Sequence, residues 1–153
     1  MSHEIHGKLP IELVPLPLWG KNLHKTLKRS EWDTIRKTVY ARQNYACGIC
    51  GTTDSQLFCH EQWEYDDETH TQTLVGFIAI CAMCNNCAHL GMSGKLVQQG
   101  YVKLDDIVEH YMRVNNCTRE TFDKDKKTAF DLWSTRSDYI DWKQEISDYR
   151  RFL

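Results

Sequence analysis

The sequence predicts an α+β fold, and three observations lead to this prediction. Two C-x2-C pairs, within residues 47–50 and 81–84, are separated by thirty residues. Two apolar runs, Leu57–Glu61 and Leu74–Ile80, have the length and composition of β-strands. Apolar residues recur at helical spacing on both sides of this stretch. With 153 residues, 41% of them apolar, the chain is long enough to bury a core as a single domain.

The N-terminal region predicts an extended segment followed by a helix. Residues 7–20 hold all three prolines of the chain, which argues against a helix there. We expect this segment to lie across the core, anchored by four apolar side chains, Leu13, Leu16, Leu18 and Trp19. Residues 31–43 show amphipathic helical periodicity, and Ser30 is the expected N-cap.

Positive charge is concentrated in this same region. Residues 1–43 contain eight Lys/Arg and four Asp/Glu, whereas the other 110 residues carry a net charge of −6. Such a basic segment favours nucleic acid, because Lys and Arg displace counterions from phosphate, although a solvated helix face explains the same charges. We interpret 1–29 as an extended basic arm, and the candidate nucleic-acid contacts are Lys25, Lys28, Arg36 and Lys37.

The two cysteine pairs predict a metal site. Four thiolates at about 2.3 Å satisfy tetrahedral zinc with no open position, which is the pattern of a structural site. Cys47, Cys50, Cys81 and Cys84 are the expected ligands, and an iron centre of rubredoxin type is the alternative. Gly48 and Gly51 would let the backbone turn sharply around the sulfurs. The remaining thiols, Cys59, Cys87 and Cys117, are interpreted mainly as packing residues.

A helix is expected to begin within residues 81–90, directly after the second strand, so that a metal knuckle would join a hairpin and a helix N-terminus as in a treble clef. Gly91, Gly94 and Gly100 predict a looser connector. Two helices are expected to follow, at 105–114 and 118–134, and the tail 137–153 is compatible with strand, helix or both. Residues 30–92 would thus form the helix and zinc-stapled core, and 93–153 a C-terminal helical extension.

Two histidines could carry chemistry. His60 ends the first predicted strand, and His89 lies five residues after Cys84. If the strands pair and the helix packs across them, these imidazoles face each other, as in a ββα-metal site. There a strand histidine can activate water for attack on a phosphodiester, while a helix histidine holds a divalent metal.

These residues resemble the HNH endonuclease superfamily, in the zinc-stapled branch with two CxxC pairs. The resemblance is carried by CGIC, LFCHEQWEYD and QTLVGFIAICAMCNNCAHLG. A group of bacterial and phage proteins of this kind is similar also in the flanks IELVPLPLWGKNLHK, WDTIRKTVY and FDLWSTRSDYIDW. The resemblance implies His60 as general base and His89 as ligand of a catalytic divalent metal (Mg²⁺, Mn²⁺ or Ni²⁺). Asn85 would be an orienting residue or a helix cap, and Cys59 occupies the usual place of an acidic ligand.

The leading expectation is therefore an HNH-like, metal-dependent endonuclease that hydrolyses phosphodiester bonds in DNA. The alternative is a catalytically inactive zinc module that binds nucleic acid or a protein partner, for example a phage-type inhibitor or adaptor. No apolar run is long enough for a transmembrane helix, and the N-terminus lacks the pattern of a signal peptide, so we expect no membrane partner and a cytoplasmic location.

Overall fold

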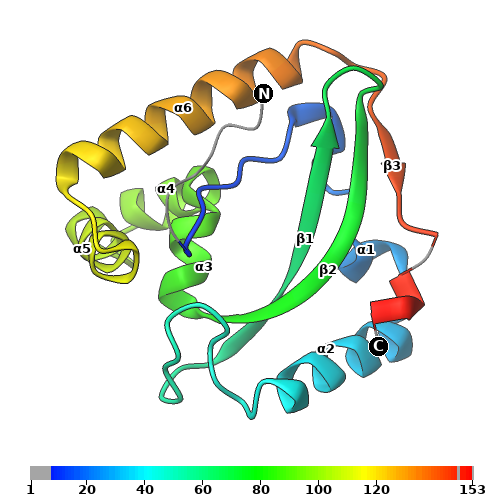
Figure 1. Ribbon diagram of the computed structural model, residues 1–153, viewed down its shortest axis with the longest axis horizontal. Helices are drawn as coiled ribbons and strands as arrows, with labels where there is room; N and C mark the ends of the chain where they lie inside the picture. Colours follow the sequence, from blue (N-terminus) through cyan, green and yellow to red (C-terminus); the bar gives the residue numbers. More distant parts are fainter. Residues whose placement is uncertain (1–7, 148, 153) are drawn as a thin grey trace.

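A long antiparallel hairpin forms the centre of the protein, shown as a computed structural model in Figure 1, which describes residues 8–147 and 149–152. Its strands are β1 (Leu57–Asp66) and β2 (Thr71–Cys81). A short third strand, β3 (Lys143–Glu145), pairs in parallel with the start of β2, so the sheet order is β1-β2-β3. The fold is α+β, as expected from the sequence.

Both hairpin strands extend further than the apolar runs indicated. The polar stretch after Glu61 continues β1, and a four-residue turn leads directly into β2. The extension is stabilised from outside the hairpin, because the ring of Tyr65 packs edge-on against Trp142 and lies under the guanidinium of Arg136. These partners are about seventy residues away in the sequence, so the local pattern could not indicate them. A register shift between Gln62 and Trp63 interrupts the pairing.

Six α-helices surround the hairpin within the described residues. They are α1 (Leu23–Thr26), α2 (Arg29–Arg42), α3 (Ala82–Ala88), α4 (Leu90–Gln98), α5 (Leu104–Asn115) and α6 (Arg119–Ser137). None of these helices is long and apolar enough to cross a membrane. Helix α2 begins earlier than expected: Lys28 is its N-cap, and Ser30 lies within the first turn.

The glycine-punctuated connector was predicted wrongly. Residues 90–98 form α4, although Gly91 and Gly94 lie inside it. The helix is held by Leu90 and Ser93, which are buried, and the hydroxyl of Ser93 donates to the carbonyls of Asn86 and Leu90. This tertiary anchoring outweighs the conformational cost of the two glycines.

The two faces of the hairpin cover two separate hydrophobic cores. On one face, α1 and α2 bury Leu23, Ile35 and Val39 against Leu74 and Ala79 of β2. On the other face, α3, α5 and α6 enclose a core that includes the cysteine pairs, Ile80, Ile107, Tyr111 and Phe122. Figure 1 shows the corresponding arrangement, with α2 on one side of the hairpin and α3 to α6 on the other.

The N-terminal segment is extended, as predicted, and lies across the second core. Leu9 and Ile11 are buried, and the backbone of Leu9 both donates to and accepts from the side chain of Asn115 in α5. Among the expected anchors, Leu18 is buried and Leu13 is partly buried, whereas Leu16 and Trp19 are 47% and 56% exposed. The latter two lie in and after a 3-10 turn, η1 (Leu16–Leu18), which directs them outward.

The C-terminal tail contains both strand and helical turn. After β3, the 3-10 turn η2 (Tyr149–Phe152) packs on α2 and β2, where Tyr149 and Arg150 bond to Glu31 of α2. The tail therefore joins the α2 side of the molecule, as seen in Figure 1.

Candidate metal centre and histidine site

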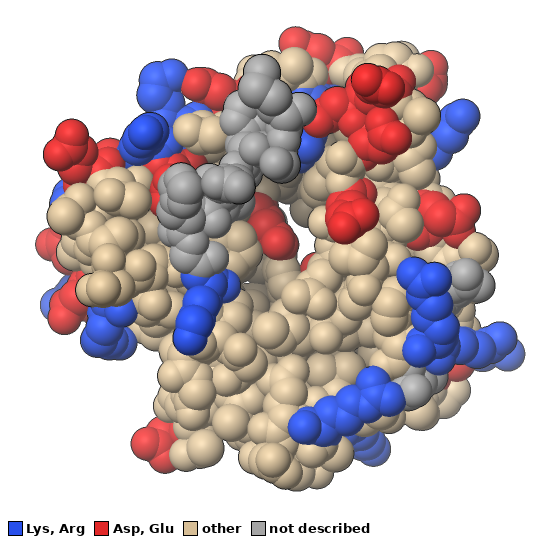
Figure 2. Space-filling view, in the orientation of Figure 1, with Lys and Arg blue, Asp and Glu red and all other residues tan. Residues whose placement is uncertain are grey.

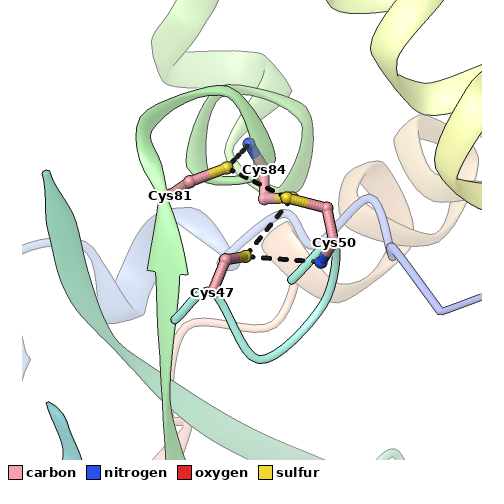
Figure 3. Close-up of side chains that lie close together, drawn as sticks. All are labelled: Cys47, Cys50, Cys81 and Cys84. Carbon is pink, nitrogen blue, oxygen red and sulfur yellow. Dashed lines mark hydrogen bonds between the residues drawn. The ribbon is translucent and has the colours of Figure 1, made fainter. Parts of the chain in front are cut away.

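The four predicted cysteine ligands converge. Their sulfur atoms all lie within 4.8 Å of one another (Figure 3). The Cys47 and Cys84 sulfurs are 3.8 Å apart, and those of Cys50 and Cys81 are 3.6 Å apart. Four sulfurs at about 2.3 Å from a tetrahedral ion are about 3.8 Å from each other, so the cluster has the dimensions of a zinc site. The four cysteines could hold a structural metal ion such as zinc.

The turn that carries the first pair is built to surround a sulfur. The backbone N–H groups of Ile49 and Cys50 each donate to Sγ of Cys47 over 3.4 Å. Burial alone would raise the pKa of the Cys47 thiol, but backbone hydrogen bonds outweigh this effect and lower the pKa to about 7. The local backbone therefore favours the thiolate, which is the form that binds metals.

Glycine is required at two positions of this turn. A Cβ atom on Gly48 would lie 2.7 Å from Cγ1 of Ile78, and Gly51 has a φ of +79°. The close approach is fixed by hydrogen bonds to β2, since the Gly48 N–H and the Gln43 side chain both bond the backbone of Ala79. Gly51 thus allows the turn that the sequence suggested, whereas Gly48 is required for its close approach to Ile78.

The second pair begins α3. Cys81 is the N-cap of this helix, and its Sγ accepts a hydrogen bond from the N–H of Cys84. Sγ of Cys84 also contacts Nε2 of His110 over 3.1 Å, and Nδ1 of the same ring accepts from the Arg113 guanidinium over 3.0 Å. His110 is 7% exposed. His110 was not among the site residues predicted from the sequence; the available signal was its place in the apolar stripe of α5, three residues after Ile107.

The two predicted catalytic histidines meet at the C-terminal end of α3. Nδ1 of His60, on β1, lies 3.1 Å from Nε2 of His89, which follows the last residue of α3. His60 is 7% exposed. Burial lowers the pKa of His89, and the positive charge that His60 can carry lowers it further, to about 4. His89 is therefore neutral near pH 7.

A carboxylate completes this group. Oε2 of Glu12 lies 2.7 Å from Nε2 of His60, so His60 stands between Glu12 and His89. Glu12 reaches this position because its backbone N–H donates to the carbonyl of Ala88 at the end of α3. Glu12 was not predicted as a site residue, and no local pattern marks it, since 48 residues separate it from His60.

Cys59 and Asn85, the other two residues that the resemblance associated with this site, have different roles. Alternation along β1 turns Cys59 and Glu61 to the α2 side, where Cys59 packs in the first core and Glu61 accepts from the N–H of Leu23. Burial raises the pKa of the Cys59 thiol to about 12, with a smaller contribution from Glu61. Asn85 does not cap α3, because Cys81 does; it lies in the helix interior, and its carbonyl accepts from the N–H of His89.

The predicted nucleic-acid contacts lie on the side of the hairpin away from His60. Lys25, Lys28 and Lys37 are exposed on α1, on the N-cap of α2 and on α2 itself, whereas Arg36 is paired with Asp33 at 2.9 Å. Helix α2 packs on the face that carries Cys59, not on the face that carries His60. Figure 2 shows Lys and Arg gathered at the lower right, in the region of α2 and η2.

The histidine site is a line of three groups rather than a cage. Within the described part of the chain, the four cysteines are the only His, Cys, Asp or Glu side chains whose ligand atoms converge as a metal site requires. In the line, both nitrogens of His60 already bond other side chains. Glu12, His60 and His89 therefore do not fit a divalent cation in this arrangement.

The comparisons with known proteins are negative. No protein-family model matches the chain, and neither the curated proteins nor the solved structures contain a significant match.

Proposed function

We propose that this protein is a phosphodiester hydrolase of HNH type that acts on DNA, with a treble-clef ββα core held together by zinc. One observation carries the proposal: His60 and His89, from the strand and the helix end that flank the cysteine cluster, face each other at 3.1 Å. Paired imidazoles can take a proton from water and return one to a leaving oxygen. The zinc ion would hold the strand and helix in register without taking part in the reaction.

The resemblance also implies a catalytic divalent metal, but the line of Glu12, His60 and His89 offers it no cage. The reaction is therefore assigned to the imidazoles alone. Whether cleavage needs a divalent metal is tested by varying the metal in the cleavage assay.

Plasmid cleavage by the full-length, zinc-loaded protein tests the proposal. Supercoiled DNA would be incubated with Mg²⁺, Mn²⁺, Ni²⁺ or EDTA, using wild type, His60→Ala, His89→Ala and the matched control His24→Ala on α1. We expect cleavage to fall by roughly 10²-fold or more in the first two variants and to stay unchanged in the control. Equal cleavage in all four proteins, or none under any condition, would reject the proposal.

A second candidate is a zinc module that binds nucleic acid or a protein without catalysis. One observation favours it: His60 is almost fully buried, and both of its ring nitrogens bond other side chains. This candidate predicts a salt-dependent DNA mobility shift, or capture of a protein partner, by a protein that cleaves nothing.

A further inference from the structure

The line Glu12, His60, His89 has a defined order of donors and acceptors. A carboxylate oxygen only accepts hydrogen bonds, so Nε2 of His60 donates to Glu12 across 2.7 Å. A neutral His60 then has its lone pair on Nδ1, which accepts from Nε2–H of His89 across 3.1 Å. The lone pair of His89 is consequently on its own Nδ1.

This last nitrogen reaches solvent. Among the described residues, no fully buried polar side-chain atom is without a hydrogen-bond partner. Within that same part of the chain, the only hydrogen bond of the His89 ring is the one from Nε2 to His60. Nδ1 of His89 therefore lies at an accessible surface, unlike the two nitrogens of His60.

We propose that Glu12 is a positioning residue that sets the tautomers of the two imidazoles, so that Nδ1 of His89 is the base presented to substrate water. This reverses the roles that the family resemblance implies, since His60 would relay the effect of the carboxylate and His89 would meet the water. The catalytic part of the proposal rests on the nuclease function proposed above. The tautomeric part stands on the hydrogen bonds alone.

The backbone holds Glu12 where this role requires it. Its N–H bonds the carbonyl of Ala88, the residue directly before His89, over 2.8 Å. Three residues earlier, Leu9 exchanges two hydrogen bonds with Asn115. The carboxylate is thus fixed relative to both histidines by main-chain contacts, and its side chain can be altered without removing those anchors.

NMR of the zinc-loaded protein tests the tautomers directly. Long-range ¹H–¹⁵N spectra at pH 7.5 should show both His60 and His89 protonated at Nε2. In Glu12→Ala, which removes the acceptor, we expect both rings to shift toward mixed tautomers. Glu12→Gln, which keeps an acceptor oxygen, should shift them less, and the matched control Glu64→Gln on β1 should shift neither. Unchanged His89 ¹⁵N shifts in folded Glu12→Ala would overturn the proposal.

Kinetics separate this proposal from the proposed function. If the protein cleaves DNA, Glu12→Ala should lower kcat by roughly 10- to 100-fold with little change in KM, and Glu12→Asp should restore part of the loss. A kcat in Glu12→Ala equal to that of wild type would overturn the positioning role while leaving the nuclease assignment intact. The wild-type protein could cleave nothing while Glu12→Ala still shows the expected tautomer shifts. That result would reject the nuclease function and the role of His89 as a base. It would uphold the role of Glu12 in setting the tautomers.

Discussion

His110 directs a proton at the sulfur of Cys84. A guanidinium only donates hydrogen bonds, so Nδ1 of His110, 3.0 Å from the Arg113 guanidinium, must accept. The ring proton is then on Nε2, which lies 3.1 Å from Sγ of Cys84. The sulfur is therefore positioned as an acceptor, which suits a metal-bound thiolate. Without a metal, burial first and then the charges of the neighbouring cysteines raise the pKa of the Cys84 thiol.

Removing this hydrogen bond should weaken metal binding. Groups that support the ligands of a metal typically change its affinity by 10- to 100-fold. We expect His110→Ala to lower zinc affinity by about that factor, measured by competition with a chromophoric chelator. His24→Ala, at an exposed ring on α1, is the matched control, and equal affinity in both variants would show that His110 does not support the site.

Loss of one cysteine ligand should unfold the core around the cluster. Structural zinc sites in small peptides contribute roughly 10–16 kcal/mol of binding free energy, which is also folding free energy. We expect Cys47→Ser to lose its zinc and its cooperative unfolding transition, measured by metal analysis and calorimetry. Cys117→Ser, which alters a thiol outside the cluster, should keep one zinc per chain. A Cys47→Ser protein that melts like wild type would contradict a structural role for the metal.

The glycines of the chain offer a matched pair of stability probes. In Gly48→Ala the new Cβ would lie 2.7 Å from Ile78, so we expect a loss of about 1–3 kcal/mol in the free energy of unfolding. In Gly94→Ala nothing lies within 4 Å of the new Cβ inside α4, so we expect a gain of about 0.5–1 kcal/mol. Denaturant titration of both variants measures the difference, and a Gly48→Ala protein at least as stable as wild type would contradict the close approach at Gly48.

Two thiols outside the cluster, the buried Cys87 and the partly buried Cys59, should be inert. Burial raises the pKa of both the Cys59 and the Cys87 thiol to about 12, so the thiolate fraction of each is very small at pH 8. We expect iodoacetamide to modify them only after unfolding, as read by peptide mass spectrometry. Because the folded pKa exceeds the unfolded value, their contribution to stability is complete below about pH 8.5 and declines as pH rises toward 12. Rapid labelling of native protein at pH 8 would contradict this burial.

The cysteine cluster was predictable because its information is local. Each C-x2-C pair lies in a single turn, and the hairpin between the pairs follows from two apolar runs, so the sequence alone indicated four convergent thiols. The pairing of His60 with His89 followed from the same hairpin and helix. Here local pattern and tertiary structure agree.

The remaining site residues depend on distant contacts that no local pattern encodes. Glu12 meets His60 because the N-terminal segment bonds Ala88, and His110 meets Cys84 because α5 packs on α3. The glycine-containing α4 likewise forms because tertiary contacts bury Leu90 and Ser93. The basic residues could not be placed relative to the histidines for a related reason. Charge can be counted in a sequence, but the face of the sheet that a helix covers is decided by packing.

Because α2 lies on the face away from His60, other cations would have to hold any DNA that is cleaved at the histidines. Lys8 lines the cavity of about 110 Å³ that Glu12 and His60 also line. It also lines a groove of about 800 Å³, together with Arg113. If DNA is cleaved at the histidines, Lys8→Gln should weaken binding and reduce the dependence of log K on log salt by about 0.9. The charge-matched control Lys28→Gln, on the α2 side, should alter binding little. Fluorescence anisotropy across a salt series measures both affinities, and a larger loss in Lys28→Gln would place the DNA on the face away from His60.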